Sequence, residues 1–395
     1  MTTPFPRRVR PSLPLILHVR TVSGAGGGPE KTILNSPRFY GEFGYRALCV
    51  YLHPPGDPGI ETLKRRAAGS GAHLFPLVDR GRWDLRLIAK LAAVCRRLNV
   101  QVWHSHDYKT NAIGLLVRRC WRMAMVTTVH GWVKHTARTP LYYAIDKRCL
   151  PWFDQVVCVS EDLQEECLRA GVPAEKCTVI HNGIDIDRAQ RRLSRDEAKA
   201  RLSAPKDGRL IGAVGRLSAE KGFDKLIEAA VAMPKAGRPV HLWIAGEGDA
   251  RADLESLIRN LGCGDYVRLL GQLSDPATFY QAMDVFALSS YREGLPNVVL
   301  EAMAYEAPVV ATRVAGVPAL VRDGEDGLLV NPGSAEELSA AISEILDDAG
   351  LADRLAKSAR MRIESGFSFR ERTRKVCEIH DRARTDAGIV PQRAV

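Results

Sequence analysis

Residues 209–223 read RLIGAVGRLSAEKGF, a short apolar strand that runs into a turn and then into a helix. The strand is expected to end at Gly215 and the helix to start near Gly222. Arg216 and Lys221 then flank a helix N-terminus, where two fixed cations could hold a diphosphate. Lys221 taken alone would also suit a solvated first turn. The segment lacks the Gly-Lys-Ser/Thr ending of a P-loop, so ATP hydrolysis of that kind is not expected.

A similar unit stands near the start of the chain. The apolar run LPLILHV (13–19) precedes SGAGGGPE (23–30), which leads into a helix. Consecutive glycines let the backbone approach a ligand, although a tight strand-to-helix turn is an equally simple reading, and the spacing is not that of a dinucleotide fingerprint. Arginines before the run mimic a signal peptide. The run is short and contains Pro14 and His18, so we expect a buried strand.

Short apolar strands alternate with helical patterns along both halves of the chain. Near-continuous apolar strands indicate parallel sheets covered on both faces. We therefore predict an α/β fold of two doubly wound, Rossmann-like domains facing a central cleft, with ligands at the carboxyl ends of strands. The expected strands are 13–19, 46–52, 72–77, 100–105, 125–130, 155–160, 177–181, 209–214, 240–245, 266–270, 284–288, 308–312 and 327–330. The expected second-half helices lie near 221–232, 250–260, 276–282, 297–304 and 335–348.

A polar, charged stretch separates the two halves. We predict an N-terminal domain over 1–190, a linker over 191–207 and a C-terminal domain over 208–365. Residues 366–395 are expected to form a C-terminal helix, which could cross back to the first domain, followed by a loose tail.

Charge differs between the halves. Residues 1–190 contain 27 Lys and Arg against 16 Asp and Glu, whereas residues 191–395 contain 29 against 30. The basic first half implies an anionic partner: nucleic acid, a membrane surface or an anionic substrate. The nine cysteines are scattered without a C-x-x-C pair, which indicates a reducing compartment and argues against a disulfide scaffold or zinc ribbon. No stretch approaches the ~18 apolar residues of a membrane span.

The sharpest motif is YREGLPNVVLEAM, residues 291–303. Pro296 suits the first turn of a helix, which places Glu293 in the preceding loop and Glu301 inside the helix. A carboxylate beside a diphosphate would repel it. Ionised carboxylates only accept hydrogen bonds, which suits the hydroxyls of a ribose and a hexose.

Histidines follow two predicted strands of the first half. His104 and His106 end one strand, and one of them is expected to be structural while the other faces the cleft. His130 ends another strand and could position or polarise a substrate, although a satisfied structural histidine is the alternative. Neither this pair nor Asp185 with Asp187 has a further ligand at convincing spacing, so no metal site is predicted.

Taken together, these residues resemble the retaining glycosyltransferases of family 4, which have the two-domain GT-B fold. The resemblance covers nearly the whole chain and is most specific in the second half. The second-half matches are GAVGRLSAEKGFDKLIEA (212–229), LWIAGEGDAR (242–251), VRLLGQLSD (267–275), EGLPNVVLEAMA (293–304) and PVVATRVAGVPALVRDGEDGLLV (308–330). The looser first-half matches are GGGPEK (26–31), WHSHDYKTN (103–111), TTVHGW (127–132), VSEDL (159–163) and VIHNGIDI (179–186).

The resemblance implies roles for individual residues. Glu301 would hold the donor ribose, Glu293 the transferred sugar, and Arg216 with Lys221 the diphosphate. His130 would lie near the transferred sugar. Together with Glu293, Arg216 and Lys221, it would form the catalytic set. The other implied donor-binding residues are Gly26, Gly27, Gly215, Gly246, Leu273, Gly294, Leu295, Pro296, Asn297 and Val298. The implied acceptor-side residues are His106, Lys109 and Asn111. Such enzymes typically need no divalent metal, so no cofactor is expected beyond the sugar nucleotide.

The chain departs from the family pattern near the donor pocket. Tyr305, Glu306 and Ala307 stand where a small residue and Gly are common, Ala315 replaces the first of two glycines, and Ala319 replaces a glutamate. These departures leave the identity of the donor open.

The implied activity is that of a retaining, hexosyltransferase-type glycosyltransferase. It would move a sugar from a nucleoside diphosphate to a hydroxyl of a glycan or lipid-linked acceptor, in cell-surface polysaccharide or glycolipid synthesis. The alternatives are a nucleotide-sugar epimerase or phosphorylase on the same fold, or a non-catalytic protein that binds an anionic surface. We expect a cytoplasmic protein with peripheral contact to the inner membrane face and no nucleic-acid partner, because basic runs interleaved with aromatic residues are scarce.

Overall fold

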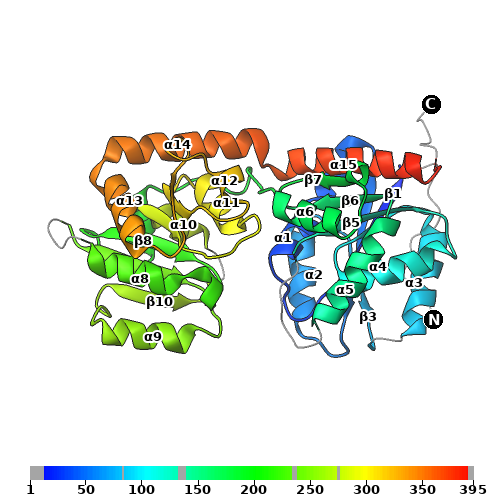
Figure 1. Cartoon of the computed structure of the whole chain (residues 1–395), viewed down its shortest axis with the longest axis horizontal. Helices are drawn as coiled ribbons and strands as arrows, with labels where there is room; N and C mark the ends of the chain where they lie inside the picture. Colours follow the sequence, from blue (N-terminus) through cyan, green and yellow to red (C-terminus); the bar gives the residue numbers. More distant parts are fainter. Residues whose placement is uncertain (1–12, 82–83, 132–138, 234–237, 274–275, 390–395) are drawn as a thin grey trace. The chain divides into compact units, whose positions relative to one another are not determined.

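The computed structural model describes residues 13–81, 84–131, 139–233, 238–273 and 276–389. They form two compact units (Figure 1). The first unit contains the described residues up to Val159, together with 163–180 and those from Arg372 onward. The second contains 160–162 and 181–371.

The first unit is built on a seven-stranded parallel sheet with the order β3-β2-β1-β4-β5-β6-β7. The strand order reverses between β1 and β4, which is where doubly wound sheets bind ligands. Its strands are β1 (Leu15–Thr21), β2 (Arg46–His53), β3 (Leu74–Val78), β4 (Val100–Ser105), β5 (Ala124–Val129), β6 (Gln155–Cys158) and β7 (Cys177–Val179). Its helices are α1 (Gly28–Asn35), η1 (Pro37–Phe43), α2 (Gly59–Gly69), α3 (Leu85–Leu98), α4 (Tyr108–Arg118), α5 (Thr139–Cys149), η2 (Leu150–Trp152), α6 (Glu161–Arg169) and η3 (Ala174–Lys176).

The second unit repeats this order in a six-stranded parallel sheet, β10-β9-β8-β11-β12-β13, which reverses between β8 and β11. Its strands are β8 (Arg209–Val214), β9 (Val240–Ala245), β10 (Val267–Gly271), β11 (Val285–Leu288), β12 (Val309–Thr312) and β13 (Leu328–Val330). Its helices are α7 (Arg195–Arg201), η4 (Ala219–Lys221), α8 (Phe223–Ala232), α9 (Arg251–Asn260), α10 (Ala277–Ala282), α11 (Asn297–Ala304), α12 (Val317–Leu320), α13 (Ala335–Asp347) and α14 (Ala349–Gly366).

The predicted α/β fold with two doubly wound sheets is confirmed. Every predicted strand is present, with its ends within two residues of the expected ones. The run over 13–19 becomes the central strand β1, whose first five residues are all buried. Strands enclosed on both faces need apolar side chains on both, which is why their sequences do not alternate.

The last helix, α15 (Phe369–Asp386), begins in the second unit and continues in the first. Val376, Ile379 and Ala383 are buried in a core cluster of the first unit that also contains Ile16 of β1 and Val102 of β4. The first unit therefore takes part of its core from the end of the chain. Of the predicted loose tail, residues 390–395 lie outside the described part.

Residues 191–207, for which the sequence predicts a linker, pack onto the second unit. Lys199 is buried, and its ammonium lies 2.6 Å from a carboxylate oxygen of Asp284 and 2.9 Å from the carbonyl oxygen of Gly208. The Arg191 guanidinium donates to the carbonyl oxygens of Tyr305 and Gln281. The division between the two units falls between residues 180 and 181.

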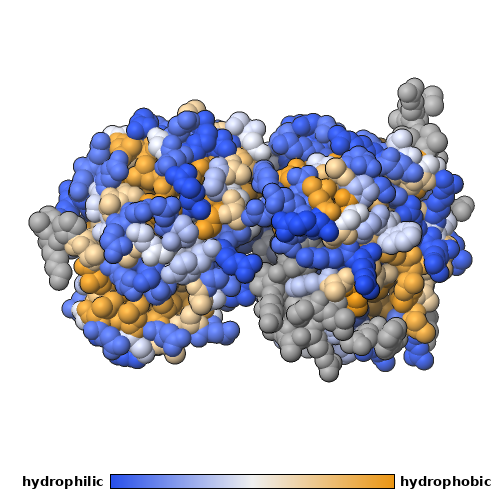
Figure 2. Space-filling model, viewed as in Figure 1, coloured by the Kyte–Doolittle hydropathy of each residue, from blue (hydrophilic) through white to orange (hydrophobic). Residues whose placement is uncertain are grey.

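The surface is mainly hydrophilic on the face drawn in Figure 2, with apolar residues in separate patches. None of the described helices is both long and apolar enough to span a membrane. All nine cysteines lie in the described residues and are free thiols, as their scattered spacing predicts.

Candidate functional site

The loops at the carboxyl ends of β8, β9 and β11 touch one another through glycines. A Cβ on Gly246 would lie 1.7 Å from the carbonyl oxygen of Gly215. A Cβ on Gly222 would lie 2.3 Å from the carbonyl oxygen of Ser289, and Gly222 has the left-handed φ of 59°. No other residue fits at these two positions without moving backbone. The turn of the 209–223 motif is thus held against the neighbouring loops.

This packing joins Lys221 to Glu293. The Lys221 ammonium lies 2.7 Å from Glu293 Oε1, and the Ser290 hydroxyl donates to the same oxygen at 2.7 Å. The Lys221 side chain is 18% exposed and that of Glu293 is 8% exposed. The charges of the predicted diphosphate-binding and sugar-binding residues therefore balance each other in the protein without substrate.

Glu301 lies on α11 and has a different partner. The Tyr280 hydroxyl donates to Glu301 Oε2 at 2.8 Å. Burial, followed by the charge of Glu301, raises the pKa of Tyr280 well above its ordinary value, so the phenol stays a donor. Pro296 is the N-cap residue and the helix runs from Asn297 to Ala304, as predicted. The carboxylates of Glu293 and Glu301 are each fixed by a separate hydroxyl donor.

Arg216 lies two residues beyond β8 and is exposed. Among the residues that the structure describes, its guanidinium makes no hydrogen bond or ion pair. It differs in this from Lys221, whose charge is balanced by Glu293. Of the two predicted cations, Arg216 is the one ready to take an anion without breaking a contact of this kind.

The predicted donor-binding residues 294–298 lie at the start of α11, whereas Leu273 follows β10. Leu295 is buried, while Val298 and Leu273 are partly buried against the same core cluster. The backbone N–H of Gly316 donates to the carbonyl oxygen of Gly294 at 3.1 Å, which ties the loop before α11 to the loop after β12. Asn297 is half-buried.

Two of the departures from the family pattern have backbone conformations that favour glycine. Glu306 has a φ of 55° and Ala315 a φ of 38°. A left-handed backbone costs a non-glycine residue about 1–2 kcal/mol. This chain therefore keeps a strained geometry at both positions where the pattern commonly has glycine.

In the first unit, the glycine-rich loop surrounds an acidic side chain. Gly27 donates its backbone N–H to the Glu30 carboxylate, which also forms an ion pair with Arg20. A Cβ on Gly26 would lie 2.5 Å from Glu30 Cγ. The loop therefore holds a protein carboxylate, and an external anion would reach the Gly27 amide only by displacing Glu30.

Two predicted acceptor-side residues are engaged within the first unit. Lys109 forms an ion pair with Asp79 and donates to the carbonyl oxygen of Gly81 at 3.0 Å. Asn111 is buried; its amide NH₂ donates to Asp146 at 2.6 Å, and its carbonyl accepts from two hydroxyls on neighbouring strands. An acceptor could bind Asn111 only by displacing these partners.

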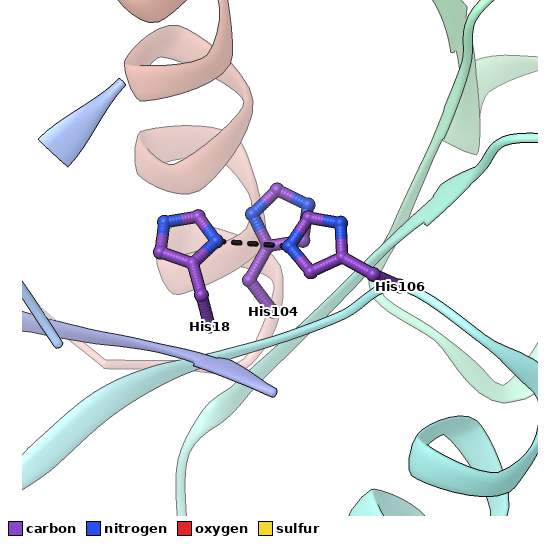
Figure 3. Close-up of side chains that lie close together, drawn as sticks. All are labelled: His18, His104 and His106. Carbon is purple, nitrogen blue, oxygen red and sulfur yellow. Dashed lines mark hydrogen bonds between the residues drawn. The ribbon is translucent and has the colours of Figure 1, made fainter. Parts of the chain in front are cut away.

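The predicted histidines belong to a larger cluster in the first unit. His18 of β1 and His106 after β4 are joined by a 3.0 Å hydrogen bond between His18 Nδ1 and His106 Nε2 (Figure 3). His106 Nδ1 lies 3.2 Å from His130 Nε2. His104 Nδ1 lies 3.0 Å from Nε2 of His380 on α15. His104 and His106 are both buried.

Burial keeps these imidazoles neutral. It lowers the pKa of His18 to about 3, and the charge of Arg372 acts in the same direction. Burial, followed by the neighbouring histidines, lowers the pKa of His104 and His106 well below the ordinary value. The pKa of His130 is also lowered well below the ordinary value, first by burial and then by the charges of Arg20 and Arg372.

His18, His104 and His106 are close enough to share a metal ion, with ligand atoms within 4.8 Å of one another. The nitrogens of His18 and His106 that face each other are already hydrogen-bonded, and both nitrogens of His104 are used by Thr128 and His380. The guanidinium of Arg372 would add to the charge of a dication buried here. The cluster fits neutral rings better than a metal.

A second group of possible metal ligands consists of three buried cysteines on β6, α6 and β7. Cys158 Sγ lies 3.6 Å from the sulfur atoms of both Cys167 and Cys177, and all three residues are buried among apolar side chains. Thiol contacts of this kind need no metal, and the three residues act as core fillers.

Sequence reasoning missed His18, His380, Ser290 and Tyr280. A histidine inside an apolar strand was a signal for His18. Ser290 precedes the 291–303 motif by one residue, so its closeness to Glu293 could have been expected. Tyr280 and His380 lie on helices whose packing brings them to their partners, and no local pattern marks them.

Comparisons with known proteins agree over both units. Residues 194–362 match the family model described as "Glycosyl transferases group 1", and residues 26–188 match that of "Glycosyltransferase Family 4". A lipopolysaccharide core biosynthesis glycosyltransferase, LpsE, of Rhizobium meliloti is 40% identical over 54% of this chain and 60% of its own length. The uncharacterized glycosyltransferase MJ1607 of Methanocaldococcus jannaschii is 30% identical over 68% of this chain and 72% of its own. The capsular polysaccharide biosynthesis glycosyltransferase CapM of Staphylococcus aureus is 28% identical over 72% and 77%.

Solved structures show the same fold. A glycosyltransferase from Rickettsia africae superimposes with a TM-score of 0.78 at 20% identity, over 94% of this chain and 98% of that one. Anabaena HepE, solved with UDP-glucose, also gives 0.78, at 24% identity over 92% and 98%.

Proposed function

Because this chain belongs to the glycosyltransferases of family 4, we propose that it moves a hexose from a nucleoside diphosphate to a hydroxyl of a glycan or lipid-linked acceptor in cell-surface polysaccharide or glycolipid synthesis. The observation that carries the proposal is the joined pair Lys221 and Glu293, which lies in the loops after β8 and β11; Glu301 lies on α11, the helix that follows Glu293. Relatives named for lipopolysaccharide core and capsule synthesis support the acceptor class. The UDP-glucose complex of Anabaena HepE supports the donor class.

The charges suit the departure of a diphosphate. Negative charge builds on the leaving group as the sugar passes through an oxocarbenium-like state. Arg216 would take the diphosphate first, because its guanidinium makes no competing ion pair among the described residues. Lys221 would then turn from Glu293 toward the phosphate oxygens. That exchange frees Glu293 to accept hydrogen bonds from the sugar hydroxyls while Glu301 accepts those of the ribose.

We propose that the anomeric configuration is retained, by attack from the face that the diphosphate leaves. We nominate no residue as a covalent nucleophile. No metal is invoked, because Arg216 and Lys221 supply positive charge at the leaving group.

The first unit would bind the acceptor. His130 would contact the substrate, with His106, Lys109 and Asn111 supporting it and the strand ends behind it. Peripheral attachment to the cytoplasmic membrane face would place a lipid-linked acceptor within reach. Helix α3 is the element we nominate for it, because it carries four basic residues and no acidic ones and exposes Leu85 beside Arg86 and Lys90.

The test is a panel of sugar nucleotides, first ranked by thermal shift and then assayed for nucleotide release with and without acceptor glycans. We expect release of a nucleoside diphosphate that depends on the acceptor, together with a glycosylated product of retained configuration by NMR. Conversion of the sugar nucleotide without acceptor would favour the epimerase reading, and dependence on phosphate would favour the phosphorylase reading. Transfer with inversion would overturn the retaining assignment.

A further inference from the structure

Three imidazoles form a continuous hydrogen-bonded chain in the first unit. The contacts run from His18 Nδ1 to His106 Nε2 at 3.0 Å, and from His106 Nδ1 to His130 Nε2 at 3.2 Å. The first of these contacts is the dashed line in Figure 3. These contacts link the ring of His130, the predicted catalytic histidine, through His106 to the buried ring of His18.

The rings in such a chain cannot choose their tautomers independently. A neutral imidazole carries one N–H and one bare nitrogen, so each contact needs one of each. Only two arrangements satisfy both contacts. In one, every ring carries its proton on Nδ1 and the hydrogen bonds point from His18 toward His130. In the other, every ring carries its proton on Nε2 and the bonds point the opposite way.

The buried end of the chain decides between the two arrangements. His18 Nε2 is buried and has no hydrogen-bond partner among the described residues. An unpaired N–H in such a place is rarer in proteins than an unpaired acceptor. The arrangement with protons on Nδ1 leaves a bare nitrogen there, whereas the other would bury an unpaired N–H.

The nearby cations keep the chain neutral. Arg372 acts on His18, Arg20 acts on His106 and His130, and Arg20 also donates to the carbonyl oxygen of His106 at 2.9 Å. A further proton on any of the three rings would be both desolvated and repelled. A neutral chain preserves the coupling between the tautomers.

We propose that His18 and His106 are positioning residues that hold His130 as its Nδ1–H tautomer, so that His130 donates a hydrogen bond from Nδ1 to a substrate oxygen. This rests on the proposed function only for the substrate that receives the bond. The tautomer itself is a property of the first unit and can be measured without any sugar nucleotide.

The same cluster contains a matched control. His380 is as deeply buried as His18 and is hydrogen-bonded to His104, which in turn contacts Thr128. Neither His104 nor His380 is hydrogen-bonded to the three-ring chain. Replacing His380 therefore removes a buried ring from the same cluster without removing a link to His130.

The experiment compares three variants of the full chain with the native protein. His18→Leu removes the first donor of the chain, His18→Asn keeps an N–H near the position of Nδ1, and His380→Leu is the control. Nitrogen-15 NMR of labelled histidines, assigned with a His130→Gln variant, reports which ring nitrogen of His130 carries the proton. Steady-state kinetics with the sugar nucleotide found above give kcat and KM separately.

We expect His130 to be the Nδ1–H tautomer in the native protein, in His18→Asn and in His380→Leu, and to become a mixture in His18→Leu. The kcat of His18→Leu should fall by about 10-fold, the effect of roughly one hydrogen bond, with KM nearly unchanged. An Nε2–H tautomer in the native protein, or equal effects of His18→Leu and His380→Leu on that signal, would overturn the proposal. If His18→Leu does not fold, the native and His18→Asn spectra still decide the tautomer. If the expected tautomers were found but no sugar transfer were detected, the assignment of the three-histidine hydrogen-bonded chain would hold and the proposed function would be refuted.

Discussion

The two units share one strand order but carry different chemistry at the strand ends. In the first unit, the central strands β1 and β4 bring together buried neutral histidines. In the second, the loops after β8 and β11 bring together a lysine and a glutamate of opposite charge. The common scaffold fixes where functional groups lie, and the loop residues fix what these groups can do. Perturbing one unit and measuring the other tests whether the two chemistries are independent.

The largest expected difference is in acid stability. His18, His104, His106 and His380 are buried with pKa values below the ordinary value near 6.5, so the unfolded chain binds more protons than the folded one below that pH. The free energy of unfolding is therefore highest above about pH 6.5. It decreases as the pH is lowered below that value, by up to about 1.4 kcal/mol for each ring and pH unit.

Four such rings predict a loss of several kcal/mol in the first unit between pH 7 and pH 5.5. Hydrogen exchange with mass spectrometry, corrected for the intrinsic effect of pH, should show β1 and β4 opening before β8 and β11. In the second unit, burial lowers the pKa of His241 as well, but that histidine is only partly buried. Simultaneous opening of both units would contradict the expected contrast.

The next largest effect is on turnover, which is expected to depend on the charged pair of the second unit. Glu293→Ala and Lys221→Ala should each lower turnover at least ~100-fold, because charge that is arranged in advance for the transition state is lost. Thermal unfolding should show that both variants stay folded. The control is Lys225→Ala, which removes a lysine that pairs with Glu228 at 2.7 Å on the surface of the same unit. Near-normal transfer by both site variants would refute the assignment.

A third prediction concerns the charge difference between the halves. Replacing Arg86 and Lys90 of α3 with glutamine should weaken flotation with anionic liposomes by at least about 10-fold at low salt, since each basic residue contributes about 1 kcal/mol near such a surface. The matched control replaces Lys225 and Arg259 of the second unit. Equal losses in both variants would show that the binding is not confined to the first unit.

The smallest effect concerns strain in the second unit. Ala315→Gly should raise the free energy of unfolding by up to about 1 kcal/mol, because glycine adopts the left-handed conformation without the Cβ clash. Urea unfolding, read from the fluorescence of Trp243, measures it. A comparable gain from Ala319→Gly, which lies in the short helix α12, would show that strain at Ala315 is not the cause.

Much of the fold could be predicted because its signals are local. A parallel strand covered on both faces must be apolar along its length, and the turn after β8 needs glycine. The linker over 191–207 was predicted from polarity, which is a local signal as well. Lys199 and Arg191 are charged residues whose partners lie on α10, just before β11 and after α11, and composition does not show that they are paired.

The candidate site was harder to predict, because its contacts join distant residues. Glu293 and Lys221 were predicted to serve different parts of the substrate, and only the folded chain shows that they contact each other across 72 positions. His380 meets His104 across 276 positions. Packing between separate elements decides such pairs, and a single sequence carries no periodicity that reports them.

The return of α15 to the first unit has a consequence for biosynthesis. The core around Ile16 and Val102 closes only with Val376, Ile379 and Ala383. A chain emerging from the ribosome can form the second sheet as soon as β13 is out, but the core of the first unit stays incomplete until α15 has emerged. The unit whose strands are made first is thus the last to complete its core.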